Sequence, residues 1–174
     1  MLARFWIHCY NSPMTVIEKD METAFPVLPK ELEGARRLVF YDIETTGLSA
    51  YSSSLYLIGA LTYEEGRARF YQWFAPSLSC ELEILRAFFR FLRPGDLLVS
   101  FNGETFDRNY LTACANQYTE GCPLSGIPSV DLLRKIRKHK DVFGLPGLRQ
   151  KAVERFLGIE REDMYTGGEL IAVY

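Results

Sequence analysis

Several residue types that build common functional sites are scarce in this chain. Its 174 residues include four cysteines and two histidines, and no two cysteines form a C-x-x-C pair. Protein zinc sites use mainly cysteine and histidine at close spacing, so a zinc site is not expected. The cysteine pattern fits reduced thiols, and we expect a cytoplasmic protein.

The chain also has no long apolar run and no strong excess of charge of either sign. Its first apolar run, Phe5-Trp6-Ile7, is too short for the hydrophobic region of a signal peptide, and no run is long enough to cross a membrane. We therefore expect no membrane partner. The net charge is only −2, so a nucleic-acid partner would have to be bound by a local patch. The oligomeric state stays open.

The apolar pattern that is present predicts one α/β domain. Residues 1–36 show little periodicity and are interpreted as a lead-in, and 37–174 as the domain. A glycine turn between β-type runs predicts antiparallel pairing, and later strands alternate with helices. We predict a mixed sheet of about five strands with helices on its faces. The predicted strands are 37–43, 55–62, 68–74, 96–101 and 127–130, and the predicted helices follow Ser79, span 105–117, and begin near 132 and 146.

An unusual acidic pair ends the first predicted strand. In YDIETTGL (41–48), Asp42 and Glu44 are two residues apart, so their side chains share one face of a strand and repel each other. Asp107 follows the fourth predicted strand. If that strand is parallel to the first, Asp107 faces the pair, and the carboxylates raise one another's pKa values. A bound cation removes this penalty, and a ligand set of oxygens alone favours Mg²⁺ or Mn²⁺.

Simpler interpretations exist for each feature. Asp42 and Glu44 could merely cap a turn, and Asp107 could be an acid in the first turn of a helix. The two acidic segments together favour the metal site. A basic run could follow a phosphate backbone or form the solvated face of a helix, and both interpretations stay open. Its residues include Arg134, Lys135 and Lys138.

Two segments carry a resemblance to a known family. Asp42-Ile43-Glu44-Thr45-Thr46-Gly47-Leu48 resembles the first motif of the DEDD (DnaQ-like) 3′–5′ exonucleases, whose fold is ribonuclease H-like. Phe101-Asn102-Gly103 with Phe106-Asp107 is similar to the second motif. Later segments, from Asp131-Leu132-Leu133 to Gly167-Gly168-Glu169-Leu170, resemble the YprB-type branch of these exonucleases. The resemblance covers roughly residues 37 to 174.

The resemblance implies two-metal hydrolysis of phosphodiester bonds in DNA or RNA. Asp42, Glu44 and Asp107 match three of the four acidic metal ligands of the family. The implied partner is single-stranded nucleic acid or its 3′ end. The residues that match positions holding the terminal nucleotide are Thr45, Thr46, Leu48, Asn102 and Phe106.

The chain departs from the family at the third motif, which carries a general-base His or Tyr and a fourth Asp on a late helix. That helix lies beyond the segment that matches Gly168–Tyr174. Two internal substitutes were considered. Tyr165 and Glu169 flank two glycines, which make a poor helix, and the residue that matches Asp131 orients structure in the relatives. We therefore expect impaired hydrolysis.

Two other functions were weighed. One is a nuclease-like module that binds nucleic acid or a protein without cutting. The other is a haloacid-dehalogenase-type phosphatase, in which Asp42 would be the nucleophile; Glu44 and the antiparallel strands after it fit that class poorly.

Overall fold

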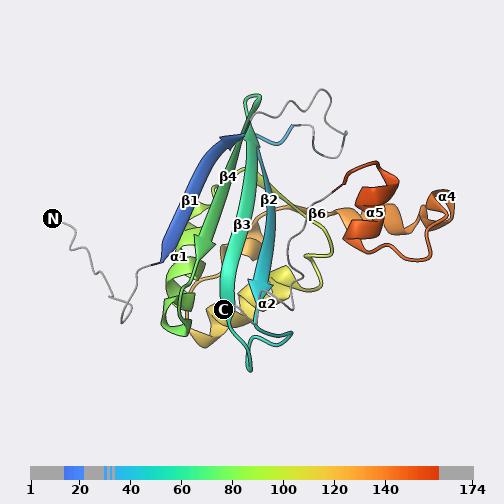
Figure 1. Cartoon of the computed structure of the whole chain (residues 1–174). Helices are drawn as coiled ribbons and strands as arrows, with labels where there is room; N and C mark the ends of the chain where they lie inside the picture. The colour runs from blue at the N-terminus through green and yellow to red at the C-terminus, as the bar shows by residue number, and fades with distance from the viewer. Residues whose placement is uncertain (1–13, 22–29, 31, 33, 161–174) are drawn as a thin grey trace.

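The computed structural model describes residues 14–21, 30, 32 and 34–160, and the statements below concern these residues. They form one six-stranded sheet with helices packed against it (Figure 1). The strand order across the sheet is β1-β4-β3-β2-β5-β6. The strands are β1 (Thr15–Met21), β2 (Arg37–Thr45), β3 (Leu55–Glu64), β4 (Arg67–Phe74), β5 (Asp96–Ser100) and β6 (Ser129–Asp131).

The predicted mixed α/β sheet is confirmed. Strands β2, β3 and β4 form an antiparallel meander, while β5 pairs parallel with β2 and β6 parallel with β5. The sheet has six strands rather than about five, because β1 comes from the segment interpreted as a lead-in and pairs antiparallel with β4. Every residue of β1 is exposed, so this strand carries none of the apolar alternation that marks a half-buried strand.

The helices follow the predicted order with changes near the C-terminal end. The basic helix predicted from residue 132 is divided into two short helices, and the last helix begins at Gln150 rather than near Pro146. Gly144 ends the second of these short helices in the left-handed conformation, with φ of 58°. The helices are α1 (Glu81–Phe91), α2 (Asp107–Gln117), α3 (Leu132–Arg137), α4 (Lys140–Phe143) and α5 (Gln150–Phe156), and two short 3₁₀ turns are η1 (Leu78–Cys80) and η2 (Pro123–Gly126).

The two faces of the sheet are covered differently. Helices α1 and α2 pack on one face, where Val39, Tyr41 and Ile43 of β2 join the main core (Figure 1). The alternate side chains of β2 point to the opposite face, where Leu38 and Phe40 belong to a smaller cluster. Asp42 and Glu44 follow the same alternation, so they lie on the face opposite to α1 and α2. No helix in the described part of the chain is long and apolar enough to cross a membrane.

A buried ion pair fixes the parallel register of β2 and β5. Arg37 and Asp96 are partners at the start of the two strands. The Arg37 guanidinium donates to both Asp96 carboxylate oxygens, at 2.8 and 2.7 Å, and to the Phe91 carbonyl at 2.9 Å. The two side chains are 3% and 1% exposed. This two-point contact brings the carboxyl ends of both strands to the same edge of the sheet.

The prediction of reduced thiols holds only in part. Cys114 and Cys122 are free, whereas Cys80 is disulfide-bonded.

Candidate metal and nucleic-acid site

The site is built where β2 runs past the end of β5. Parallel pairing between the two strands reaches only Phe40 and Val99. Beyond it, the Ile43 N–H donates to Asp107 Oδ1 at 3.0 Å. Ile43 lies between Asp42 and Glu44, so this bond fixes the Asp107 side chain beside the acidic pair. The structure thus places Asp107 against the strand segment that carries Asp42 and Glu44.

The turn between β5 and α2 delivers Asp107 to this position. Asn102 adopts a left-handed conformation with φ of 68°, which asparagine tolerates better than most residues. Gly103 follows in close packing: a Cβ atom there would lie 2.4 Å from Ser100 Oγ, 2.5 Å from Ser100 Cβ and 3.2 Å from Asp107 Oδ2. Only glycine fits this turn without a shift of the backbone.

The electrostatics of the three carboxylates are unfavourable in the absence of a cation. Asp107 is 4% exposed, and its burial, followed by the negative charge of Asp42, raises its pKa to about 7. Burial and then Asp42 also raise the pKa of Glu44. Two amide donors, from Ile43 and from Asp107 itself, oppose the shift of Asp107 but do not overcome it. A positive charge at this point would relieve the repulsion.

The residues fit a hard divalent cation by the chemistry of their donors. All three predicted ligands are carboxylates, and the space beside Asp107 Oδ2 exists because residue 103 has no side chain. However, within the described ranges no group of three His, Cys, Asp or Glu side chains is drawn together closely enough to hold a metal ion.

The loop after β2 uses its threonines for structure and exposes its leucine. Thr45 Oγ1 donates to the Gly47 carbonyl at 2.7 Å, and Thr46 Oγ1 accepts the Ser54 N–H at 2.9 Å. These bonds hold a tight loop between β2 and β3. Leu48 in this loop is 88% exposed, so a large apolar side chain stands in solvent in the segment that follows the acidic pair.

Asp131 holds the turn between β5 and α2 in place through hydrogen bonds to its backbone. Its Oδ1 accepts the N–H groups of Asn102 and Arg134, at 3.1 and 3.2 Å, and its Oδ2 accepts the Glu104 N–H at 3.3 Å. Asp131 is therefore a structural residue that ties the β5–α2 turn to the start of α3. The other considered substitutes, Tyr165 and Glu169, lie outside the described residues.

The remaining predicted pocket residues flank this turn. Asn102 accepts a hydrogen bond from Thr105 Oγ1 through its side-chain oxygen at 2.8 Å. The half-buried Phe106 ring contacts Tyr110, with 5.7 Å between ring centroids.

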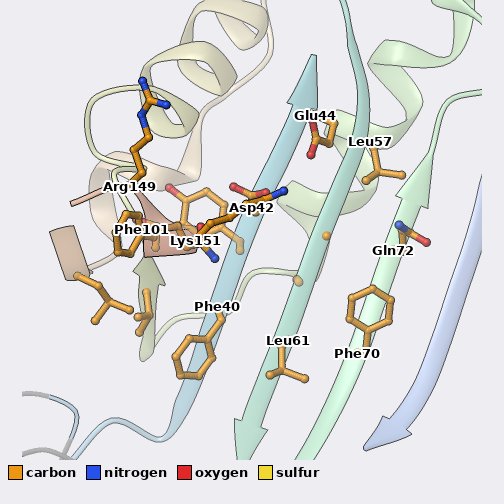
Figure 2. Close-up of a pocket in the computed structure, with 17 residues that line it drawn as sticks. Phe40, Asp42, Glu44, Leu57, Leu61, Phe70, Gln72, Phe101, Arg149 and Lys151 are labelled. Carbon is orange, nitrogen blue, oxygen red and sulfur yellow. The ribbon is translucent and has the colours of Figure 1, made fainter. Parts of the chain in front are cut away.

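A pocket of about 770 Å³ opens over the acidic pair on the sheet face opposite to α1 and α2. Asp42 and Glu44 are the carboxylates that line it, and the apolar side chains of β2, β3 and β4 form its floor (Figure 2). Its other wall, which the sequence pattern did not predict, is the start of α5. Arg149, Gln150 and Lys151 line the pocket there. The segment LRQKAVERFL contains these residues, but helical periodicity could not show that its basic end faces the carboxylates.

A second pocket of about 620 Å³ adjoins the first. It is lined by Phe101, Asn102, Leu133, Arg137, Lys140, Gly147, Leu148, Arg149 and Gln150. The basic run predicted from the sequence is divided between two surfaces. All five of these cations are exposed; Arg137 and Lys140 line this pocket, whereas Arg134, Lys135 and Lys138 line neither pocket.

The model of the RNase_H superfamily (RNase_H_2) matches residues 39–174, most of the chain. The chain belongs to the RNase H superfamily. The predicted ribonuclease H-like fold is therefore confirmed, and the antiparallel pairing of β2 with β3 rules out the parallel fold of the phosphatase alternative. The curated proteins contain no sequence that matches the chain.

Solved structures with a similar fold include a polymerase and several exonucleases. A family B DNA polymerase from the archaeon Pyrobaculum calidifontis aligns with a TM-score of 0.63 and 17% identity over 78% of this chain and 20% of the polymerase. E. coli exonuclease I in complex with a dT13 oligonucleotide aligns with a TM-score of 0.59 and 14% identity over 71% of this chain and 36% of that one. Exonuclease I from Methylocaldum szegediense aligns with a TM-score of 0.55 and 18% identity over 79% of this chain and 39% of that exonuclease. The present chain thus spans less than half the length of each of these neighbours.

Proposed function

We propose that this RNase H superfamily chain is a metal-dependent 3′–5′ exonuclease domain that acts on single-stranded DNA or RNA. One observation carries the proposal: the buried Asp107 carboxylate accepts the amide of Ile43, the residue between Asp42 and Glu44. A fold that needed these acids only for turns would not gather them where they repel.

Asp42, Glu44 and Asp107 would hold Mg²⁺ or Mn²⁺. When bound, the cations supply Lewis-acid stabilisation of the phosphodiester oxygens and a water of lowered pKa. The Ile43 N–H orients Asp107, and Asp131 keeps the β5–α2 turn in register with β6.

The terminal nucleotide would lie between the two acidic segments. Leu48 would offer exposed apolar contact from the loop after the acidic pair, while Asn102 and Phe106 flank the β5–α2 turn that carries Asp107. Thr45 and Thr46 shape the loop that carries Leu48. The complexes of E. coli exonuclease I with dT13 and dA16 oligonucleotides support single-stranded nucleic acid as the partner class.

A second function, binding without cleavage, is favoured by one observation. The described residues contain three of the four expected ligands, and Asp131 uses its carboxylate to accept three backbone amides that tie the β5–α2 turn to α3. We therefore keep binding without cleavage as the second proposal, which the cleavage assay below separates from the first.

The test is cleavage of a single strand labelled at its 5′ end, with Mn²⁺ and with excess EDTA. A 3′–5′ exonuclease yields a ladder of progressively shorter labelled products, and the ladder should disappear with EDTA or in Asp107→Asn. Asp20→Asn is the matched control, because Asp20 is an exposed acid on β1, away from the site. A ladder that Asp107→Asn leaves unchanged contradicts the proposed site, and intact substrate with retained binding assigns the second function.

A further inference from the structure

We propose that the two pockets form one path for single-stranded nucleic acid, in which Arg137, Lys140, Arg149 and Lys151 bind backbone phosphates and Phe101 stacks against a base. The path runs from the acidic pair, past the start of α5, to α3 and α4. This inference rests on the proposed function, because it specifies how the same site would hold its substrate.

The pockets are continuous. Both are lined by Phe101, Arg149 and Gln150. The first continues to Asp42 and Glu44, and the second continues to Arg137 and Lys140. A ligand that begins at the carboxylates can therefore extend past Phe101 without leaving the surface.

The charge of the lining residues changes along this path, from acidic at one end to basic at the other. The carboxylates of the lining residues, Asp42 and Glu44, are confined to the first pocket, and the second has only cations among its charged lining residues. Arg149 lies where the pockets join, and Lys151 lines the first pocket. A chain of phosphates matches this arrangement, since each cation can meet a phosphate beyond the reacting one.

Phe101 provides the aromatic surface on the path. It follows β5 directly, is half-buried, and lines both pockets. Single-strand binding sites combine a cationic groove with aromatic side chains on which bases stack, and every base offers such a face. We therefore expect the affinity for single strands to depend little on base sequence.

The same structure separates the basic run into a set on the path and a set off it. All four side chains are exposed, but Arg137 and Lys140 line the second pocket, whereas Arg134 and Lys138 line neither pocket. The two pairs come from the same short segment and carry equal charge. They form matched double variants that change net charge equally and differ in whether the replaced side chains line a pocket.

The experiment measures affinity for a fluorescently labelled oligo(dT) single strand by anisotropy, over a range of NaCl concentrations and in EDTA, so that cleavage does not interfere. Arg137→Ala/Lys140→Ala should lower the slope of log affinity against log salt by about 1.4, which is roughly 0.7 for each lost phosphate contact. Arg134→Ala/Lys138→Ala should leave the slope unchanged. Phe101→Ala should weaken binding roughly five- to 150-fold, the range for one stacked base, and Phe101→Trp should restore it.

The reverse result, in which only Arg134→Ala/Lys138→Ala lowers the slope, overturns the path and places the strand on the outer face of α3. Equal slopes for both double variants and the wild type also overturn it. Failure of the proposed function is separable: a protein that binds through the path but never cleaves refutes catalysis alone, whereas cleavage with unchanged slopes refutes the path alone. Thermal unfolding of each variant checks that the fold is intact.

Discussion

The substitution Gly103→Ala probes the closest packing in the site. A Cβ atom at this position would lie 2.5 Å from Ser100 Cβ, far inside van der Waals contact. Rotation of the Ser100 side chain can move Oγ but not Cβ, and Ser100 is fixed by the pairing of β5 with β6. The turn itself must therefore shift. Overpacking of this kind costs about 1–3 kcal/mol of unfolding free energy, or roughly 2–4 °C in Tm for each kcal/mol.

The shift should also disturb metal binding, because the added carbon lies 3.2 Å from Asp107 Oδ2. Urea unfolding and calorimetric titration with Mn²⁺ measure the two effects. Gly121→Ala is the matched control, since nothing lies within 4 Å of a Cβ atom there. The double variant Ser100→Gly/Gly103→Ala removes both Ser100 atoms from the clash and should show a favourable coupling energy. Equal stability and equal heats for Gly103→Ala and Gly121→Ala would refute the argument.

Three further predictions concern charged side chains. The pKa of Asp107 is raised to about 7 in the metal-free folded protein, whereas the same carboxyl group titrates near pH 4 in the unfolded chain. Between these two pH values the folded state binds the extra proton, so the free energy of unfolding should fall as pH rises, by at most about 1.4 kcal/mol per pH unit. Urea unfolding in EDTA measures this fall, and Asp107→Asn should lack it. Asp131→Ala should lower the free energy of unfolding by several kcal/mol, because three half-buried backbone amides lose their acceptor. Asp42→Ala should lower it little, because the Asp42 side chain is exposed. Equal losses for the two variants in urea unfolding would contradict both assignments. Asp96→Ala should cost about 3–5 kcal/mol by leaving the Arg37 guanidinium buried without its carboxylate, and a loss below 1 kcal/mol in the same assay would show that the pair does not hold the register.

Much of the sheet was predictable because its strands are half-buried or fully buried. The runs at 55–62 and 68–74 with a glycine turn correspond to β3 and β4, whose turn contains Glu65 and Gly66 at positive φ. Strand β1 was not predicted, because it joins the sheet through backbone pairing with β4 while all of its side chains are exposed. An edge strand of this kind leaves almost no trace in the hydrophobic pattern.

The acidic centre was predictable from topology alone. Once β2 and β5 are parallel, the residues that follow them meet at one edge, and Asp107 reaches Ile43 beside Asp42. The basic wall was not predictable to the same degree. The orientation of α5 depends on a connection without regular periodicity, and the break between α3 and α4 decides which cations face the pockets. The functional roles of all these side chains, and the YprB-type branch, remain predictions for experiment.

Calorimetric titration with Mn²⁺ tests the central claim most directly, because it asks whether the three carboxylates form one metal site before any question of catalysis. The wild type should give a saturable heat near neutral pH, accompanied by proton release that shows as a dependence on buffer ionisation enthalpy, since the cation displaces the proton of Asp107. Asp42→Asn and Asp107→Asn should each abolish this heat, and the exposed control Asp20→Asn should retain it. Heats from Asp42→Asn and Asp107→Asn that equal the wild-type heat would place the ion elsewhere and contradict the account.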